Sequence, residues 1–132
     1  MAYASALGRD PAQTYRRIDA AGRTATADAP ALVQLLYDEL VAALRAAAWA
    51  TEHGRYAQKS DRVQRATAIL FALDAGLDFQ TGGEVSATLA RLYAGARAAI
   101  LRAALSTDPA PFRDTANTLE EIAGAWRQAR AA

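Results

Sequence analysis

The chain has 132 residues, a length typical of one domain, and its 15 basic and 14 acidic residues give a formal net charge of +1. This balance lacks the basic excess typical of nucleic-acid-binding proteins. The absence of Cys excludes disulfides, thiolate nucleophiles and Cys-ligated zinc, and a single His leaves little material for a metal site. The sequence shows no apolar run long enough for a membrane span and no secretory signal pattern. We therefore expect a cytoplasmic protein without membrane insertion and without a nucleic-acid partner.

Alanine exceeds a quarter of the chain and β-branched residues are few, which favours helices throughout. Residues 1–27 have sparse apolar anchors, and we expect a loosely held N-terminal arm or short extra helix. The first long helix is predicted to begin at Asp28-Ala-Pro30, where a capping carboxylate precedes a proline that the first turn tolerates. It is predicted to end at His53-Gly54, because Gly adopts the left-handed conformation of a helix C-cap. Its apolar face comprises Leu32, Val33, Leu36, Tyr37, Leu40 (or Ala43), Val41, Leu44, Ala47 and Ala48.

The next two helices are predicted from apolar residues spaced three and four apart. One runs from about Tyr56 to Leu77, and the next begins at about Glu84. The stretch between them is expected to be a turn, because two adjacent glycines, Gly82 and Gly83, are unfavourable inside a helix. The apolar seam of the first of these helices contains Val63, Ala66, Leu70, Leu73 and Leu77. That of the second contains Val85, Leu89, Leu92, Ala96, Ala99 (or Ile100) and Ala103.

A fourth helix is predicted after Thr107-Asp108-Pro109, a capping residue followed by proline. Its apolar face contains Phe112, Ala116, Leu119, Ile122, Ala123 and Trp126. We expect Trp126 and Leu119 to anchor the core, because they are bulky residues on a face otherwise rich in Ala. Four amphipathic helices with short loops predict an all-α fold, an antiparallel up-down four-helix bundle formed by residues 28–132.

Four aromatic residues stand off the main apolar stripes, namely Tyr37, Trp49, Phe71 and Tyr93. The apolar arc of the first three helices is therefore wider than a four-helix core requires. Two interpretations remain open at this point. Either the Ala-rich helices pack closely and cover these rings, or the rings line a surface groove.

No residue pattern predicts a catalytic or metal site, and we expect neither enzymatic activity nor a cofactor. Asp74 and Asp78 share a helix face, but Asp78 is interpreted as bonding the turn that follows it. His53 is interpreted as a helix-end residue. An alternative is a small helical enzyme that binds a dicarboxylate through basic side chains, for which the candidates are Arg16, Arg17, Lys59, Arg62 and Arg65. Their other interpretation is a solvated helix face.

The order of several motifs resembles the flagellin export chaperones of the FliS family. The most specific part is Leu-Asp-x-x-x-Gly-Gly-Glu at residues 77–84 followed by Leu-x-x-Leu-Tyr at residues 89–93. Leu36-Tyr37-Asp38 supports the resemblance, which extends in order from about Tyr15 to Trp126. The remaining matching segments are Asp28–Leu35, Glu52–Gly54, Arg65–Leu70 and Ala125-Trp126.

The resemblance implies a helical bundle that binds the disordered C-terminal segment of flagellin, prevents premature polymerisation and delivers flagellin to the export gate of the flagellar type III apparatus. Apolar faces of the client's amphipathic helices would lie in surface grooves. It also implies that Tyr15 and Ile18 of the arm cover part of the groove when no client is bound. The expected partner-binding residues are Tyr15, Ile18, Leu32, Leu36, Tyr37, Leu40, Leu89, Leu92 and Tyr93. A purely structural bundle that oligomerises through the same apolar surface is a further alternative.

Overall fold

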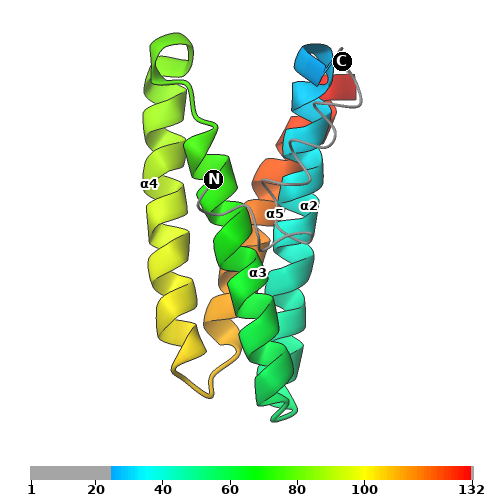
Figure 1. Cartoon of the computed structure of the whole chain (residues 1–132), viewed down its shortest axis with the longest axis vertical. Helices are drawn as coiled ribbons and strands as arrows, with labels where there is room; N and C mark the ends of the chain where they lie inside the picture. Colours follow the sequence, from blue (N-terminus) through cyan, green and yellow to red (C-terminus); the bar gives the residue numbers. More distant parts are fainter. Residues whose placement is uncertain (1–24, 132) are drawn as a thin grey trace.

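A computed structural model describes residues 25–131, with side chains from residue 30 onward except that of residue 130. The described part consists of four long helices joined by short connections (Figure 1). They are α2 (Ala25–Glu52), α3 (Tyr56–Ala75), α4 (Phe79–Ala104) and α5 (Ala110–Ala131). The predicted arm lies outside these residues, apart from residues 25–27, which belong to the first turn of α2.

The four helices form a ring in which each packs against two neighbours. Helix α2 contacts α3 and α5, and α4 contacts the same two helices from the other side. Consecutive helices run in opposite directions (Figure 1), so the predicted antiparallel bundle is confirmed. Helices α2 and α4 diverge toward the end where both begin, which we call the open end; the end where both finish is called the closed end.

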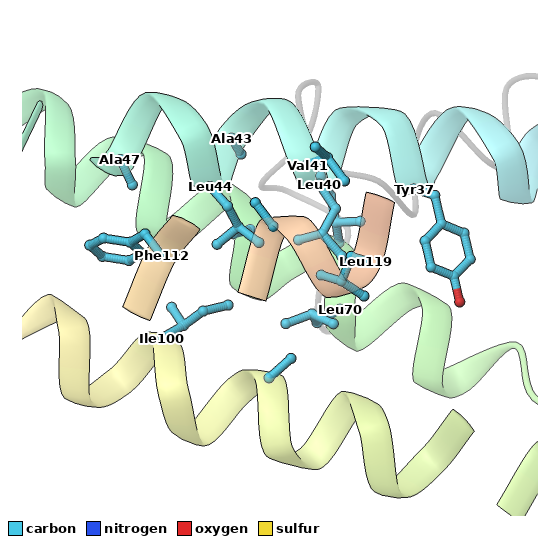
Figure 2. Close-up of a cluster of buried hydrophobic side chains, with 14 of the residues drawn as sticks. Tyr37, Leu40, Val41, Ala43, Leu44, Ala47, Leu70, Ile100, Phe112 and Leu119 are labelled. Atoms are coloured by element: carbon cyan, nitrogen blue, oxygen red, sulfur yellow. The ribbon is translucent and has the colours of Figure 1, made fainter. Parts of the chain in front are cut away.

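The core lies between the predicted apolar faces and is rich in alanine, so that the helices approach closely. Figure 2 shows aliphatic side chains from all four helices meeting around Leu44, with Phe112 toward the closed end. Leu119 is completely buried, as predicted. The largest fully buried side chains are Tyr93, Phe112, Leu40, Leu44, Ile69, Leu70 and Leu119.

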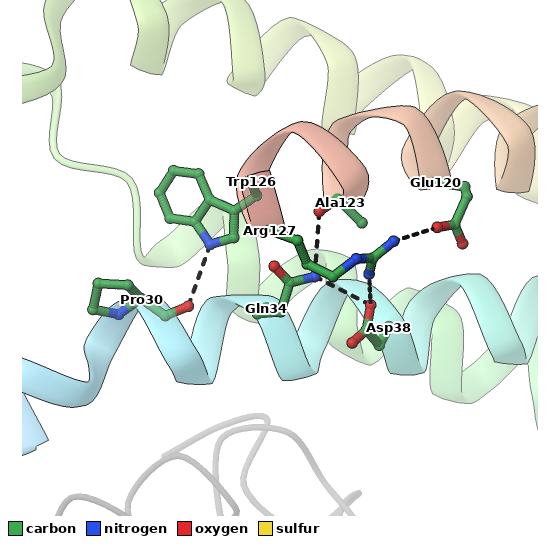
Figure 3. A network of polar contacts seen from close by, with 7 residues as sticks. All are labelled: Pro30, Gln34, Asp38, Glu120, Ala123, Trp126 and Arg127. Carbon is green, nitrogen blue, oxygen red and sulfur yellow. Dashed lines mark hydrogen bonds and ion pairs between the residues drawn. The ribbon is translucent and has the colours of Figure 1, made fainter. Parts of the chain in front are cut away.

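Trp126 does not anchor the core, and this prediction was wrong. Its side chain is 38% exposed, and its indole Nε1 donates to the carbonyl oxygen of Pro30 at 3.2 Å (Figure 3). Trp126 lies about two turns beyond Leu119 on the same face of α5. Among the described helices, α4 diverges from α2 at this end of the bundle, and the indole stays partly exposed (Figure 1).

A polar network holds α5 against α2 near the open end (Figure 3). The Arg127 guanidinium donates to Asp38 Oδ1 at 3.0 Å and to Glu120 Oε2 at 2.8 Å. These carboxylates raise the pKa of Arg127 above its ordinary value, the hydrogen bond to Glu120 contributing most. Gln34 Nε2 donates to Asp38 and, at 3.4 Å, to the Ala123 carbonyl. The α2–α5 seam therefore stays closed where α4 departs.

Two helix starts differ from the prediction. Helix α2 begins at Ala25 rather than Asp28, so Pro30 lies inside it. Pro30 removes the backbone donor to only one carbonyl near the helix start, so the cost stays local. The predicted end of this helix is confirmed, because α2 ends at Glu52 and Gly54, two residues later, has φ = 65°.

Helix α4 begins at Phe79, five residues before the predicted start, because Asp78 caps a short helical turn. Asp78 Oδ1 accepts from the backbone N–H groups of Gln80 and Thr81 at 3.0 and 3.1 Å. The helix then kinks at Gly83, whose φ of 50° only glycine adopts readily. Buried Ser86 donates to the Asp78 carbonyl across this kink at 2.8 Å. The glycine pair thus bends the helix start instead of forming the predicted turn.

Candidate functional site

An apolar pocket of about 360 Å³ occupies the open end of the bundle. It lies where α4 stands away from its neighbours, and all four described helices contribute to it. Helices α2 and α3 supply Val33, Leu36, Tyr37, Ala72, Leu73, Gly76 and Leu77. Helices α4 and α5 supply Val85, Leu89, Tyr93, Ile122, Ala125 and Trp126. The lining offers apolar surface to a binding partner, since none of these side chains is charged.

Two tyrosines bridge the widening space between α2 and α4 at the pocket. The hydroxyl oxygens of Tyr37 and Tyr93 lie 2.5 Å apart and form a hydrogen bond. Their side chains are 3% and 2% exposed, so both rings are buried. Figure 2 shows the Tyr37 ring extending inward from α2, with its hydroxyl at the far end. The two long tyrosine side chains span the distance between α2 and α4 here, which shorter side chains such as Ala or Leu would leave empty.

Burial determines the protonation of this pair. It raises the pKa of Tyr37, although the hydrogen bond with Tyr93 opposes the rise. Burial also raises the pKa of Tyr93, and the hydrogen bond to Tyr37 and the negative charge of Asp74 add to the effect. Both hydroxyls therefore keep their protons at physiological pH.

The mouth of the pocket exposes apolar side chains to solvent. Val85 is 65% exposed, and Trp126 forms part of the same lining. Val85 follows the Asp78 cap and the Gly83 kink at the start of α4. These two features therefore set the orientation of the helix at Val85. Exposed apolar groups that continue into an apolar pocket are typical of a surface that binds another chain.

The structure brings four of the expected binding residues together in this pocket: Leu36, Tyr37, Leu89 and Tyr93. The others described are elsewhere. Leu32 is buried, Leu40 is fully buried in the core, and Leu92 lines a smaller cavity of about 230 Å³ between α4 and α5. Tyr15 and Ile18 lie outside the described residues.

Several pocket residues were assigned to helix seams by the sequence analysis and not to a site, namely Leu73, Leu77, Val85, Ile122 and Trp126. Their periodicity identifies the correct helix face, but it does not show where neighbouring helices separate. The capped Gly-Gly segment before Val85 was the available signal, since it changes the direction of a helix at one end of the bundle.

The other two aromatic residues that stand off the stripes are near half exposure and are not in the pocket lining. Trp49 stacks on His53 with ring centroids 4.1 Å apart, near the closed end. His53 Nδ1 lies 2.8 Å from the Trp49 carbonyl oxygen, in keeping with a helix-end residue. Phe71 is on α3. Tyr37 and Tyr93 are thus both covered and part of the pocket lining, whereas neither interpretation holds for Trp49 and Phe71.

The basic residues of the enzyme alternative do not form a dicarboxylate site among the described residues. Arg62 and Arg65 line an open groove between α2 and α3, but Asp38 and Glu39 line it too, and Arg65 bonds Glu39 at 2.5 Å. An incoming dicarboxylate would meet these negative charges. Lys59 is buried under the α4–α5 connection and is not part of a solvated face as one interpretation held.

Within residues 25–131, no group of three or more His, Cys, Asp or Glu side chains is placed to hold a metal ion. The described helices also include none that combines the length and the hydropathy needed to cross a bilayer.

The fold and the pocket define a helical-bundle protein with an apolar pocket at its open end. The sequence pattern of the family described as flagellar protein FliS matches residues 11–132. The chain is also 29% identical over 117 residues to the flagellar secretion chaperone FliS of Salmonella typhimurium (strain LT2), covering 88% of this chain and 87% of that protein. The chain belongs to the FliS family of flagellar proteins.

Proposed function

We propose that this protein is a cytoplasmic export chaperone that binds the disordered C-terminal segment of flagellin, prevents its premature polymerisation and delivers it to the export gate of the flagellar type III apparatus. The observation that carries the proposal is the apolar pocket at the open end, in a chain whose Salmonella relative is a flagellar secretion chaperone.

The pocket suits a client that folds as it binds. Ordering a disordered segment costs several kcal/mol, about 2–5 in typical cases, so the bound state needs substantial apolar burial. Val85, Leu89 and Trp126 supply such surface near the mouth.

The N-terminal arm enters this proposal as a cover for the groove. Tyr15 and Ile18 are three residues apart, so one helical turn would place both on one side. Two apolar side chains contribute only a few kcal/mol before the ordering entropy is subtracted, so a larger client surface would displace them. Replacing both by Ala should raise amide exchange on α2 and α4 in the free protein, and unchanged exchange would contradict this role.

The test of the proposed function uses a matched pair of surface variants on α4. Val85 and Leu101 are 65% and 67% exposed, so Asp at either position should leave the fold intact. Only Val85 lines the pocket. Calorimetry with a C-terminal flagellin peptide should therefore show at least about tenfold weaker binding for Val85→Asp, because a charge would enter an apolar contact.

Leu101→Asp is the control and should bind the peptide with unchanged affinity. Equal effects of the two substitutions would place the client elsewhere on the bundle. A different result would support the structural alternative. If the wild-type protein does not bind the peptide but self-associates, and Val85→Asp abolishes the self-association, the protein is a structural bundle that oligomerises through this surface.

A further inference from the structure

The tyrosine pair leaves one hydroxyl proton without a partner. Tyr37 and Tyr93 hydrogen-bond to each other at 2.5 Å, and among residues 25–131 neither hydroxyl has another hydrogen-bond partner. Each hydroxyl carries one donor and two acceptor positions. Because both remain protonated, the pair holds two protons and its single hydrogen bond uses only one. One O–H is therefore free in an otherwise apolar pocket.

A free donor in such surroundings selects its occupant. Leaving a buried donor unpaired costs free energy, whereas an apolar group that brings an acceptor both fills the pocket and satisfies the hydroxyl. An ordered water could serve in the unoccupied state, and an entering group that displaces it would have to replace its hydrogen bond.

We propose that Tyr37 and Tyr93 form a selective hydrogen-bond donor in the pocket, so that the preferred occupant is an apolar client segment carrying one neutral acceptor. The identity of the client rests on the proposed function, whereas the donor itself does not.

The surroundings define the class of acceptor. A carboxylate would be buried in an apolar lining and would meet the negative charge of Asp74, which acts on Tyr93. An ammonium or guanidinium group offers no acceptor. Carbonyls inside a client helix already accept from their own backbone. The matching group is a side-chain amide or hydroxyl of Asn, Gln, Ser or Thr.

The first experiment needs no flagellin. Acetophenone and α-methylstyrene have nearly the same shape, but only acetophenone carries a carbonyl acceptor. Their binding is measured by NMR titration on the wild type and on the Tyr37→Phe/Tyr93→Phe variant. This variant keeps both rings and removes both hydrogen-bond partners together, so the fold should survive. Acetophenone should bind about tenfold more weakly to the variant, and α-methylstyrene should bind equally well or better.

The second experiment uses the C-terminal peptide of flagellin from the same organism. The double Phe variant should bind the peptide about tenfold more weakly than the wild type. Replacing the peptide's Asn, Gln, Ser and Thr residues by Ala one at a time should reveal one change that weakens binding to the wild type but not to the double Phe variant. Such a double-mutant cycle isolates the proposed contact.

The outcomes separate the two proposals. If the Phe substitutions change the binding of acetophenone and α-methylstyrene by the same factor, the pocket is purely apolar and the proposed donor is refuted. If acetophenone responds as expected but the wild type does not bind the peptide, the donor stands and the proposed function fails. If the peptide binds and no substitution couples to the tyrosines, the donor does not select this client.

Discussion

The two ends of the bundle are built from the same four helices but differ in how completely they are filled. At the closed end, the Lys59 ammonium donates to the Ser106 carbonyl at 2.6 Å and lies 6.0 Å from the centroid of the fully buried Phe112 ring. At the open end, a pocket of about 360 Å³ remains, and the Tyr37–Tyr93 pair has an unused donor.

This difference indicates that stability and binding are separated along the bundle. At the closed end, Lys59 ties the first turn of α3 to the α4–α5 connection, and the buried Thr51 hydroxyl donates to the Ala47 carbonyl. The open end retains apolar surface that a well-packed interior would bury. Mutations at the closed end should therefore affect folding most, and mutations at the mouth of the pocket should affect binding most.

The largest effect on folding is expected for Phe112→Ala. The ring is fully buried at the closed end, so the substitution removes apolar contacts and leaves a cavity. Its cost should be about 3–5 kcal/mol in the free energy of unfolding, measured by chemical denaturation. Burying two methylene groups already contributes more than about 1 kcal/mol. A loss below about 1 kcal/mol would therefore show that the closed end is not the stable part of the bundle.

Lys59→Met should have the next largest effect on folding. Lys59 is 6% exposed, and Met keeps most of its length while removing the charged donor to Ser106. The lost hydrogen bond should lower the free energy of unfolding by about 1–3 kcal/mol. Gln58→Met, at an exposed neighbouring position, is the control and should change it little. Equal stability of both variants would mean that Lys59 does not hold the start of α3 to the α4–α5 connection.

Trp126→Ala should cost less than Phe112→Ala despite the larger side chain. Much of the indole already contacts water, so about 2 kcal/mol or less should be lost in unfolding experiments. The same substitution should weaken binding of a flagellin C-terminal peptide more than it weakens folding, because Trp126 lines the pocket. If Trp126→Ala lowers the free energy of unfolding as much as Phe112→Ala does, Trp126 contributes to stability as a core residue, contrary to this prediction.

Most of the fold could be predicted from the sequence because it depends on local patterns. Apolar spacing identified four helices and their inward faces, and Gly54 and Asp108 marked two boundaries correctly, since the Asp108 carboxylate accepts from Ala110 N–H at 2.9 Å. These features need only the residues of one helix and its ends.

The site was less predictable because it depends on the angles between helices. Periodicity places Trp126 and Leu119 on the same face, but whether a third helix covers that face depends on how far α4 diverges. Likewise, Lys59 is indistinguishable in the sequence from a surface residue, because its burial comes from a connection 47 residues further along the chain. The Tyr37–Tyr93 contact spans 56 residues and has no local signature.

The smallest expected effect concerns the start of α4, beside the mouth of the pocket, and it appears as a pH dependence. The pKa of Asp78 lies below its ordinary value of 3.8, chiefly because its carboxylate accepts from the Thr81 backbone and then from the Thr81 side chain and the Gln80 backbone. A carboxyl group whose pKa is lower in the folded state stabilises that state above its unfolded pKa. The contribution is lost as the pH falls through the lower, folded value.

Asn also caps helices but does not titrate, so Asp78→Asn is the matched variant. The melting temperature of the wild type should exceed that of Asp78→Asn slightly at neutral pH, and the difference should shrink below about pH 4 as the carboxylate takes up a proton. Asp114→Asn, at an exposed position on α5 near the closed end, is the control and should show no such convergence. Because Asp78 is exposed, salt and water weaken the effect, and thermal melts at several pH values in low salt are the suitable measurement.

A constant difference between wild type and Asp78→Asn down to pH 3 would mean that the Asp78 charge does not hold the start of α4. The direction of Val85 at the pocket mouth would then depend on the Gly83 kink and the Ser86 hydrogen bond alone.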